Sequence, residues 1–417
     1  MLQQTLPMEA VQAIFKWLPP TSVLKYKRLS RWIDTCLSDS HFARENLSCF
    51  NVPIRTVTDE SETDSVRELE DDEVELDGFE EDEGLDSEGA ILPPKSHLQL
   101  NNQLWGLLGP ESECSSVLLL REWDLAWFHW PAPHQTAYAL LELSTKHKLV
   151  WRSTLLKGAV IPRSIGILNH LCHLSLADSG LTGALPAELG NLANLQTLNL
   201  SGNQICGSIP ESLTRLRGLK LLNLGGNLLT GSLPAEIGAL RSLQVLMLHK
   251  NQLSAELPAS LWTCRALLLL KLDNNRFTGT LACSSTTTNS EPPGLHQLSQ
   301  LECLDLSQNQ FSGALPAQLG SLTRLCKLYL GGNAFSGKVP NAWGCLKRLQ
   351  ECSVRGNKLN GLVPWDAVLR LRDLQTLDLS GNSELSGRVD EFIVQQLRWL
   401  RYLDVSGTNL EKIKCVV

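Results

Sequence analysis

A motif of the form LxxLxLxxNxLxGxLP recurs through the second half of the chain and constrains the fold more than any other feature. Its asparagine position is held by Ser179, Asn203, Asn227, Asn251, Asn275, Asn309, Asn333, Asn357, Asn382 and Thr408. Most of these positions are 24 residues apart, so ten units can be counted. A fixed period of this length predicts a solenoid built from stacked coils.

The letters of one unit have separate physical roles. The leucines of "LQTLNL" predict a short strand whose apolar side chains point into the coil. The asparagine that follows can bond backbone groups of the neighbouring coils, which stacking would otherwise leave without partners. Gly207 gives the conformational freedom that a tight turn needs. One coil cannot bury its leucine stripe alone, so the stack must form as a whole.

The segments "GSIPESLTRL", "GSLPAEIGAL" and "GALPAQLGSL" resemble the plant-type leucine-rich repeat. The resemblance implies an α/β solenoid over residues 158–417, a right-handed horseshoe with a parallel sheet on its concave face. The step from Asn275 to Asn309 is 34 residues, which indicates an inserted loop near 282–294. Secreted members of this class usually carry a disulfide-bearing N-terminal cap, and this sequence shows none before the repeats.

Charge is distributed unevenly along the chain. The net charge is −7, and residues 59–88 contain 17 Asp and Glu and one Arg, a net of −16. Residues 52–97 are therefore expected to be a disordered acidic linker. The rest of the chain is −7 + 16 = +9 without a basic tract, so no nucleic-acid partner is expected. We expect residues 59–88 to reach basic parts of the chain and occlude the concave face.

Residues 5–45 have a different pattern from the repeats. Val11, Ile14, Phe15 and Leu18 fall on one face of a helix, and "LPP" then ends it. The stretch "LPMEAVQAIFKWLPPTSVLKYKRLSRWIDTCLSDSHF" resembles an F-box. A helical cap that packs on the solenoid is the alternative. The resemblance implies that an adaptor subunit would contact Leu6, Pro7, Ile14, Leu18, Pro19, Val23 and Leu24.

The two resemblances together predict a non-catalytic substrate receptor of an SCF-type (cullin–RING) ubiquitin ligase, cytoplasmic or nuclear or both. The F-box would dock on the adaptor and the repeats would bind the protein substrate. The alternative is a leucine-rich-repeat interaction scaffold, cytosolic or associated with the membrane cortex, without a ligase role. An extracellular recognition module is a third possibility. The twelve cysteines have no zinc spacing, no HExxH occurs and no apolar stretch spans a bilayer, so we expect no metal, cofactor, catalytic site or transmembrane segment.

The concave strand faces are the expected substrate surface. Outward positions of the third to fifth clear repeats form an apolar column that is expected to be exposed, beside polar neighbours. A second, polar group begins two coils later. The candidate residues are Leu221, Val245, Met247, His249, Lys271 and Asp273 in the first group and Lys327, Tyr329 and Arg355 in the second. An N-terminal flank or the inserted loop covering the first group is the alternative.

Residues 98–157 are unrepetitive and rich in tryptophan. Trp123, Trp127, Phe128 and Trp130 lie close together in this region, in the stretch "REWDLAWFHWPAPHQ". The structural interpretation is a cap that buries the open end of the first coil, and the alternative is a ligand platform. We expect the cap.

Overall fold

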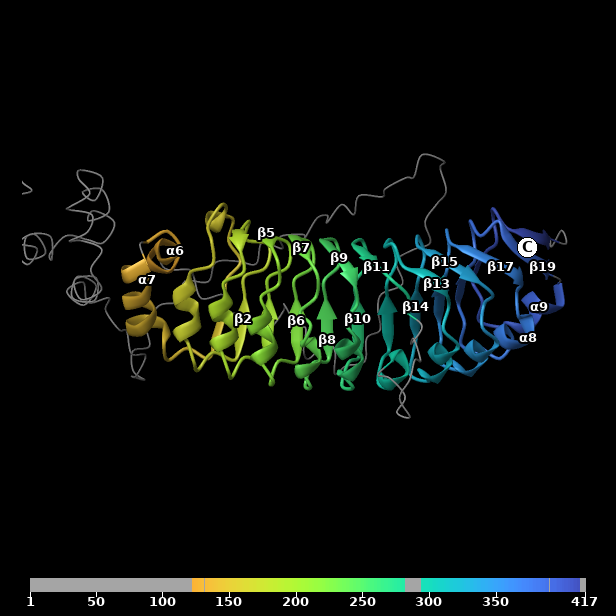
Figure 1. Ribbon diagram of the computed structural model, residues 1–417, viewed down its shortest axis with the longest axis horizontal. Helices are drawn as coiled ribbons and strands as arrows, with labels where there is room; N and C mark the ends of the chain where they lie inside the picture. The colour runs from red at the N-terminus through yellow and green to blue at the C-terminus, as the bar shows by residue number, and fades with distance from the viewer. Residues whose placement is uncertain (1–121, 131, 282–293, 390, 413–417) are drawn as a thin grey trace, which may run out of the picture.

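The computed structural model describes residues 122–130, 132–281, 294–389 and 391–412. Figure 1 shows coils stacked side by side along one long axis, with helices α6 (Glu122–Trp127) and α7 (Ala132–Tyr138) at the N-terminal end. The F-box-like residues 5–45, the acidic linker 52–97 and residues 98–121 of the tryptophan-rich region lie outside the described residues. Their predicted structure is therefore still a prediction.

One parallel sheet of eleven strands runs the length of the solenoid and confirms the predicted leucine-rich architecture. The strands are β1 (Lys148–Val150), β2 (His173–Ser175), β4 (Thr197–Asn199), β6 (Leu221–Asn223), β8 (Val245–Met247), β10 (Leu269–Lys271), β12 (Cys303–Asp305), β14 (Lys327–Tyr329), β16 (Glu351–Ser353), β18 (Thr376–Asp378) and β20 (Tyr402–Asp404). Each pairs with the strand of the next coil, residue for residue. Strand β1 falls in the region 98–157, ahead of the first counted repeat.

The return path of each coil begins with a second short strand. One five-stranded sheet consists of β3 (Thr182–Ala184), β5 (Gln204–Gly207), β7 (Leu228–Gly231), β9 (Gln252–Glu256) and β11 (Arg276–Thr278). The other consists of β13 (Ser312–Ala314), β15 (Ala334–Gly337), β17 (Lys358–Leu362), β19 (Glu384–Val389) and β21 (Asn409–Lys412). The division falls at the insertion, where a single bridge joins Thr280 to Ser312. The main sheet continues past it because β10 pairs directly with β12.

Short helical turns complete the coils on the side opposite the main sheet. After α7 come a π-helix, η2 (Ala139–Leu143), and the 3-10 helices η3 (Thr154–Leu156), η4 (Arg163–Ile167), η5 (Ala187–Asn191), η6 (Glu211–Arg215), η7 (Ile237–Ala239), η8 (Ala259–Thr263), η9 (Leu295–Gln297), η10 (Ala317–Ser321) and η11 (Asn341–Cys345). The last two coils use α8 (Trp365–Val368) and α9 (Glu391–Gln396) instead. A proline precedes most of these turns, with φ near the value that its ring imposes.

The asparagine ladder predicted from the sequence is present. Asn227 accepts a hydrogen bond from the Ile205 N–H at 3.0 Å and donates to the carbonyl oxygens of Leu200 and Leu224, both at 3.0 Å. Asn251 donates to the same Leu224 oxygen at 2.9 Å, so each carbonyl joins two asparagines. The ladder therefore satisfies buried backbone groups from coil to coil.

The aromatic residues of the N-terminal helices belong to the core. Trp127, Phe128 and Trp130 are buried and join the same apolar cluster as the leucines of the first coils. The rings of Trp127 and Trp151 meet edge to face, with centroids 6.1 Å apart. The packing of these rings supports the cap interpretation for the described part of the tryptophan-rich region; the side chain of Trp123 lies outside it.

Two turn positions in the coils have left-handed backbone conformation. The first precedes the ladder asparagine and the second is the glycine of the GxLP element, as at Gly207 with φ +77°. In one coil the second position is Ala255, with φ +71°. A Cβ is unfavourable in this region of φ/ψ space, so the coil of Ala255 is locally strained.

Replacing Ala255 with glycine is expected to raise the free energy of unfolding by about 1 kcal/mol, because it relieves this strain. The reverse change, Gly207→Ala, should lower it by a similar amount, since the added Cβ would meet only Ala184 Cβ at an ordinary 3.5 Å. Urea unfolding followed by tryptophan fluorescence measures both. Equal stability of the wild type and both variants would show that the left-handed position carries no strain.

Candidate functional site

The apolar column expected on the concave face is present but not exposed. Leu221, Val245, Leu269 and Cys303 are 2%, 0%, 3% and 6% exposed and form a cluster of their own, with Met247 and Leu268 packed against it. The residues are directly opposite one another on β6, β8, β10 and β12, where neighbouring strands bring side chains into contact. The expectation of a solvent-exposed apolar patch is therefore wrong. Its role in binding is still a prediction.

The polar neighbours of this cluster are also packed. A Cβ built at Gly225 would lie 2.2 Å from the imidazole of His249, which shows that the ring lies flat on that glycine. Burial and the nearby Lys271 ammonium lower the pKa of His249. The Nζ of Lys271 lies 4.0 Å from an Asp273 carboxylate oxygen, and the Asn274 amide donates to the other oxygen at 2.8 Å. His249, Lys271 and Asp273 thus lie near one another, as the sequence predicted.

Lys327 and Tyr329 are committed to a contact inside the protein. The Lys327 Nζ forms an ion pair with Glu351 at 2.7 Å, and the Tyr329 hydroxyl donates a hydrogen bond to the same carboxylate. Burial and this carboxylate raise the pKa of Tyr329. Tyr329 lines the pocket described next, and Lys327 is not among its lining residues. The Lys327 charge and the Tyr329 hydroxyl are both engaged by Glu351.

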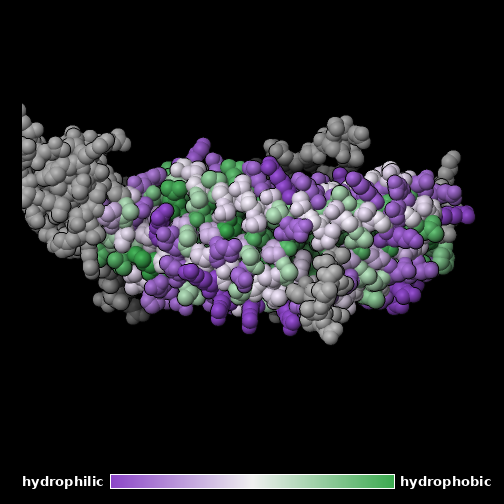
Figure 2. Space-filling model, viewed as in Figure 1, coloured by the Kyte–Doolittle hydropathy of each residue, from purple (hydrophilic) through white to green (hydrophobic). Residues whose placement is uncertain are grey.

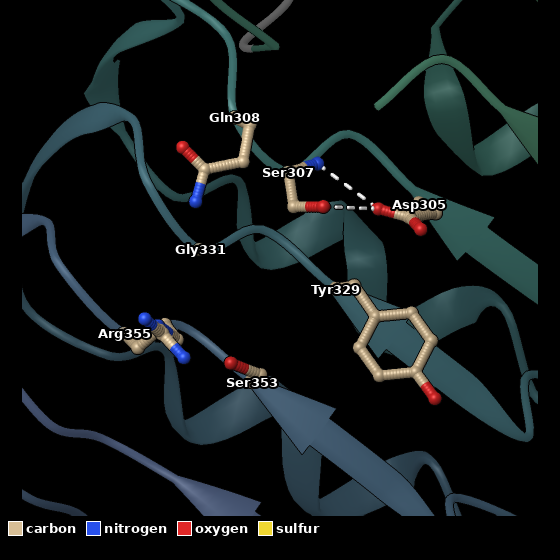
Figure 3. A pocket seen from close by; sticks show the side chains of 7 residues that line it. All are labelled: Asp305, Ser307, Gln308, Tyr329, Gly331, Ser353 and Arg355. Carbon is tan, nitrogen blue, oxygen red and sulfur yellow. Dashed lines mark hydrogen bonds between the residues drawn. The ribbon is translucent and has the colours of Figure 1, made fainter. Parts of the chain in front are cut away.

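A pocket of about 290 Å³ opens on the concave face next to this pair (Figure 3). Three successive coils supply its lining, each giving residues from the end of a main-sheet strand and the turn that follows. The lining residues are Asp305, Ser307, Gln308, Tyr329, Gly331, Ser353 and Arg355. We call this group the concave pocket.

Arg355 is the cation of the concave pocket. A Cβ built at Gly331 would lie 2.7 Å from Arg355 Cγ, so the arginine stem lies across this glycine. The side chain is exposed, and it forms no ion pair with any other residue that the structure describes. Its guanidinium is therefore available to an anionic group on a ligand.

Asp305 is the acid of the concave pocket. Its Oδ1 accepts hydrogen bonds from the Ser307 N–H at 3.1 Å and the Ser307 hydroxyl at 2.6 Å (Figure 3). Burial and the nearby Asp273 carboxylate raise the pKa of Asp305 to about 6, although the Ser307 bonds and Lys271 oppose the shift. The carboxyl thus changes charge close to neutral pH.

The raised pKa predicts that the free energy of unfolding falls as the pH rises from about 4 to 6, because the folded state holds the Asp305 proton that the unfolded state has lost. Asp305→Asn should remove this fall and add on the order of 1–2 kcal/mol at pH 7.5. The amide fits, since Asn199 accepts the equivalent bonds from Ser201. Urea unfolding at pH 4 and 7.5 measures the effect.

Asp378→Asn makes the same change at the equivalent position of another coil, where Asp378 bonds Ser380 in the same way. It controls for the amide itself. If Asp305→Asn raises the free energy of unfolding as much at pH 4 as at pH 7.5, the charge of Asp305 is not the cause of the gain in stability.

Part of the concave pocket could be predicted from the sequence. Tyr329 and Arg355 were among the candidate residues, whereas Asp305, Ser307 and Ser353, at equivalent outward positions of the strands, were not. That equivalence was the available signal. Gln308 gave no such signal, because it precedes the ladder asparagine, in a turn with φ +52°. The adaptor-contact residues of positions 6–24 lie outside the described part of the chain.

Three of the repeats match a known family model. Residues 194–216, 218–240 and 300–322 match the family model "Leucine Rich Repeat". These segments are leucine-rich repeats. No curated protein matches the chain.

Two solved receptor structures share the fold of the leucine-rich repeats. The crystal structure of a TDR receptor is 31% identical over 67% of this chain, with a TM-score of 0.58. The plant peptide hormone receptor RGFR1, in complex with RGF2, is 26% identical over 66% of this chain, with a TM-score of 0.50. The matches span 45% and 49% of those receptor chains, less than half of each. Within residues 122–412, apart from the gaps given above, no helix has the length and apolar character needed to cross a membrane.

Proposed function

We propose that the leucine-rich repeats form a non-catalytic interaction scaffold that binds a polypeptide segment at the concave pocket. The observation that supports this most is the pocket itself, whose lining comes from three coils and offers both an acid and an unpaired cation. At about 290 Å³ it is at the lower end of the range for small-molecule sites. It suits one or two side chains of a longer ligand that continues along the sheet.

The lining residues define the chemistry of that ligand. Arg355 suits a carboxylate, and the hydroxyls of Ser307 and Ser353 with the Gln308 amide suit hydrogen-bonding groups. The ring of Tyr329 offers an apolar face. A peptide with an acidic side chain fits this set. The solved receptor in complex with RGF2 supports a peptide ligand by fold analogy.

The test is selection from a random peptide library displayed on phage, with the full chain as bait. Enriched peptides should carry an acidic residue. Arg355→Glu should weaken their binding at least about tenfold in calorimetry, since it replaces attraction with repulsion. Arg276→Glu, an exposed arginine on β11, is the matched control and should leave binding unchanged.

Two outcomes would contradict the proposed site. Binding of the enriched peptides to Arg355→Glu as tightly as to the wild type would place their site elsewhere. Failure of any sequence to be enriched over an unrelated bait protein would argue against a peptide ligand.

The F-box resemblance of "LPMEAVQAIFKWLPPTSVLKYKRLSRWIDTCLSDSHF" favours a second candidate, the substrate receptor of an SCF-type ubiquitin ligase. In that role the protein performs no chemistry; it brings a substrate near the ubiquitin-loaded enzyme. It would act in the cytoplasm, the nucleus or both. The same concave pocket would then bind the substrate.

Binding of the purified full chain to the purified adaptor subunit tests this candidate. The triple variant Leu6→Ala, Pro7→Ala, Ile14→Ala should lose binding, and an unchanged melting temperature would show that the repeats still fold. Absence of binding by the wild type, where a known F-box protein binds, would leave the scaffold role without a ligase.

A further inference from the structure

One edge of the solenoid carries a row of exposed basic side chains. In most coils, the turn between the helical segment and the main-sheet strand has two residues between core positions, as in "LRGL" and "LKRL". These turns supply Arg217, Arg241, Arg265, Arg324, Lys347, Arg348, Arg372 and Arg398, all exposed. We call this row the basic ridge. It follows the lower edge in Figure 1, and Figure 2 shows hydrophilic side chains protruding there.

Stacking brings these cations close together. They lie about 24 residues apart in sequence, but neighbouring coils are separated by only about 5 Å, the distance between paired strands. One turn, which holds Ser299 and Gln300, has no basic residue and interrupts the row. Like charges at this spacing lie within one Debye length, about 8 Å at physiological salt, and repel one another.

The basic ridge is not neutralised within the described part of the chain. None of its eight cations forms an ion pair there. Lys347 donates to the backbone oxygens of Gly344 and Arg370, at 2.7 and 3.2 Å, without meeting a carboxylate. Asp373 is the one acid among the equivalent turn positions of these coils. A ridge with eight cations and one acid is a surface for a polyanion.

We propose that the acidic stretch of the same chain, residues 59–88, binds along the basic ridge. Its 17 carboxylates, of which one arginine offsets a single charge, complement the eight cations of the ridge. The ridge from Arg217 to Arg398 covers seven coil steps, roughly 35 Å. Thirty residues reach roughly 30 Å as a coil and up to about 100 Å when extended. The tether keeps its local concentration high.

This site differs from the one expected from the sequence. From the sequence, residues 59–88 were expected to occlude the concave face, whereas the ridge lies at the border of that face, where the strands begin. Within the described residues Trp399 is the one exposed aromatic side chain in these turns. Single-stranded nucleic acids bind where aromatic platforms accompany the charge, so an acidic polypeptide fits the ridge better. The inference does not depend on a ligand in the concave pocket.

The experiment uses four full-length proteins, the last of which is a control described below, and a fluorescein-labelled peptide of residues 59–88. The first protein is the wild type, and the second has all 17 acids of that stretch changed to Asn or Gln. The third adds Arg217→Glu, Arg241→Glu and Arg265→Glu to the second. Fluorescence anisotropy at 50 mM and 500 mM NaCl reports binding, and circular dichroism checks that each protein is folded.

The peptide should bind the second protein at least about tenfold more tightly than the wild type, whose own acidic stretch competes. The third protein should bind the peptide at least about tenfold more weakly than the second, and 500 mM salt should abolish binding. A matched fourth protein instead carries Arg276→Glu on β11, Lys358→Glu on β17 and Lys338→Glu directly after β15. It should bind as tightly as the second.

Three results would overturn the proposal. Equal binding to the wild type and the second protein would show that the acidic stretch does not occupy the site. Equal loss in the third and fourth proteins would show attraction to net charge alone. An oligonucleotide of equal charge that binds the ridge more tightly than the peptide would make it a nucleic-acid surface.

Discussion

Replacing Asn227 with alanine is expected to lower the free energy of unfolding by about 3 kcal/mol. The change removes the acceptor of the Ile205 N–H and leaves that buried donor without a partner. It also removes one of the two asparagine donors to the carbonyl oxygens of Leu200 and Leu224. Urea unfolding, followed by tryptophan fluorescence and circular dichroism, measures the loss.

Asn194→Ala is the matched control, because Asn194 is exposed and donates one bond to the Asn169 carbonyl oxygen at 2.7 Å. It should cost less than about 0.5 kcal/mol. Similar losses in the two variants would show that burial in the ladder adds nothing. Such a result would contradict the role given to the motif asparagine.

Replacing Phe311 with alanine is expected to lower the free energy of unfolding by about 3–5 kcal/mol. Phe277, Phe311 and Phe335 stack one above another, with ring centroids 6.3 and 6.1 Å apart. Phe277 and Phe311 lie on either side of the insertion, where the second sheet is interrupted. Their contact carries the packing between coils there, so its removal should weaken the solenoid at its middle.

Two further variants separate packing from hydrophobicity. Phe311→Leu places the residue that other coils use at this position, such as Leu253 and Leu359, and should cost about 1 kcal/mol. Phe392→Ala removes a side chain that is 61% exposed and should cost under about 0.5 kcal/mol. If Phe311→Ala costs no more than Phe392→Ala, the aromatic stack does not hold the coils together.

Much of the fold could be predicted because each letter of the repeat acts within one coil or between adjacent coils. The asparagine ladder and the turn at Gly207 both followed from this local logic. Strand β1 was missed because its coil has Trp151 at the position that Leu176 and Leu200 hold in later coils, which breaks the leucine pattern of the repeat. The second sheets were missed because their strands are too short for any alternation of side chains to be visible.

The concave face was harder to predict from the sequence. Leu221, Val245 and Leu269 appear as outward positions, and outward normally means exposed. In the structure they are buried, and their side chains contact one another across three strands. In the same way, Lys327 and Tyr329 appear available until Glu351 of the next coil is brought beside them.

The sequence by itself determined that this chain stacks leucine-rich coils, since a 24-residue period with one buried asparagine per unit has few other solutions. Only the tertiary structure decided which side chains of different coils meet. The concave pocket joins three coils, and the basic ridge joins cations that look dispersed along the chain. The physical reason is the stacking distance, because residues one repeat apart come within about 5 Å of each other.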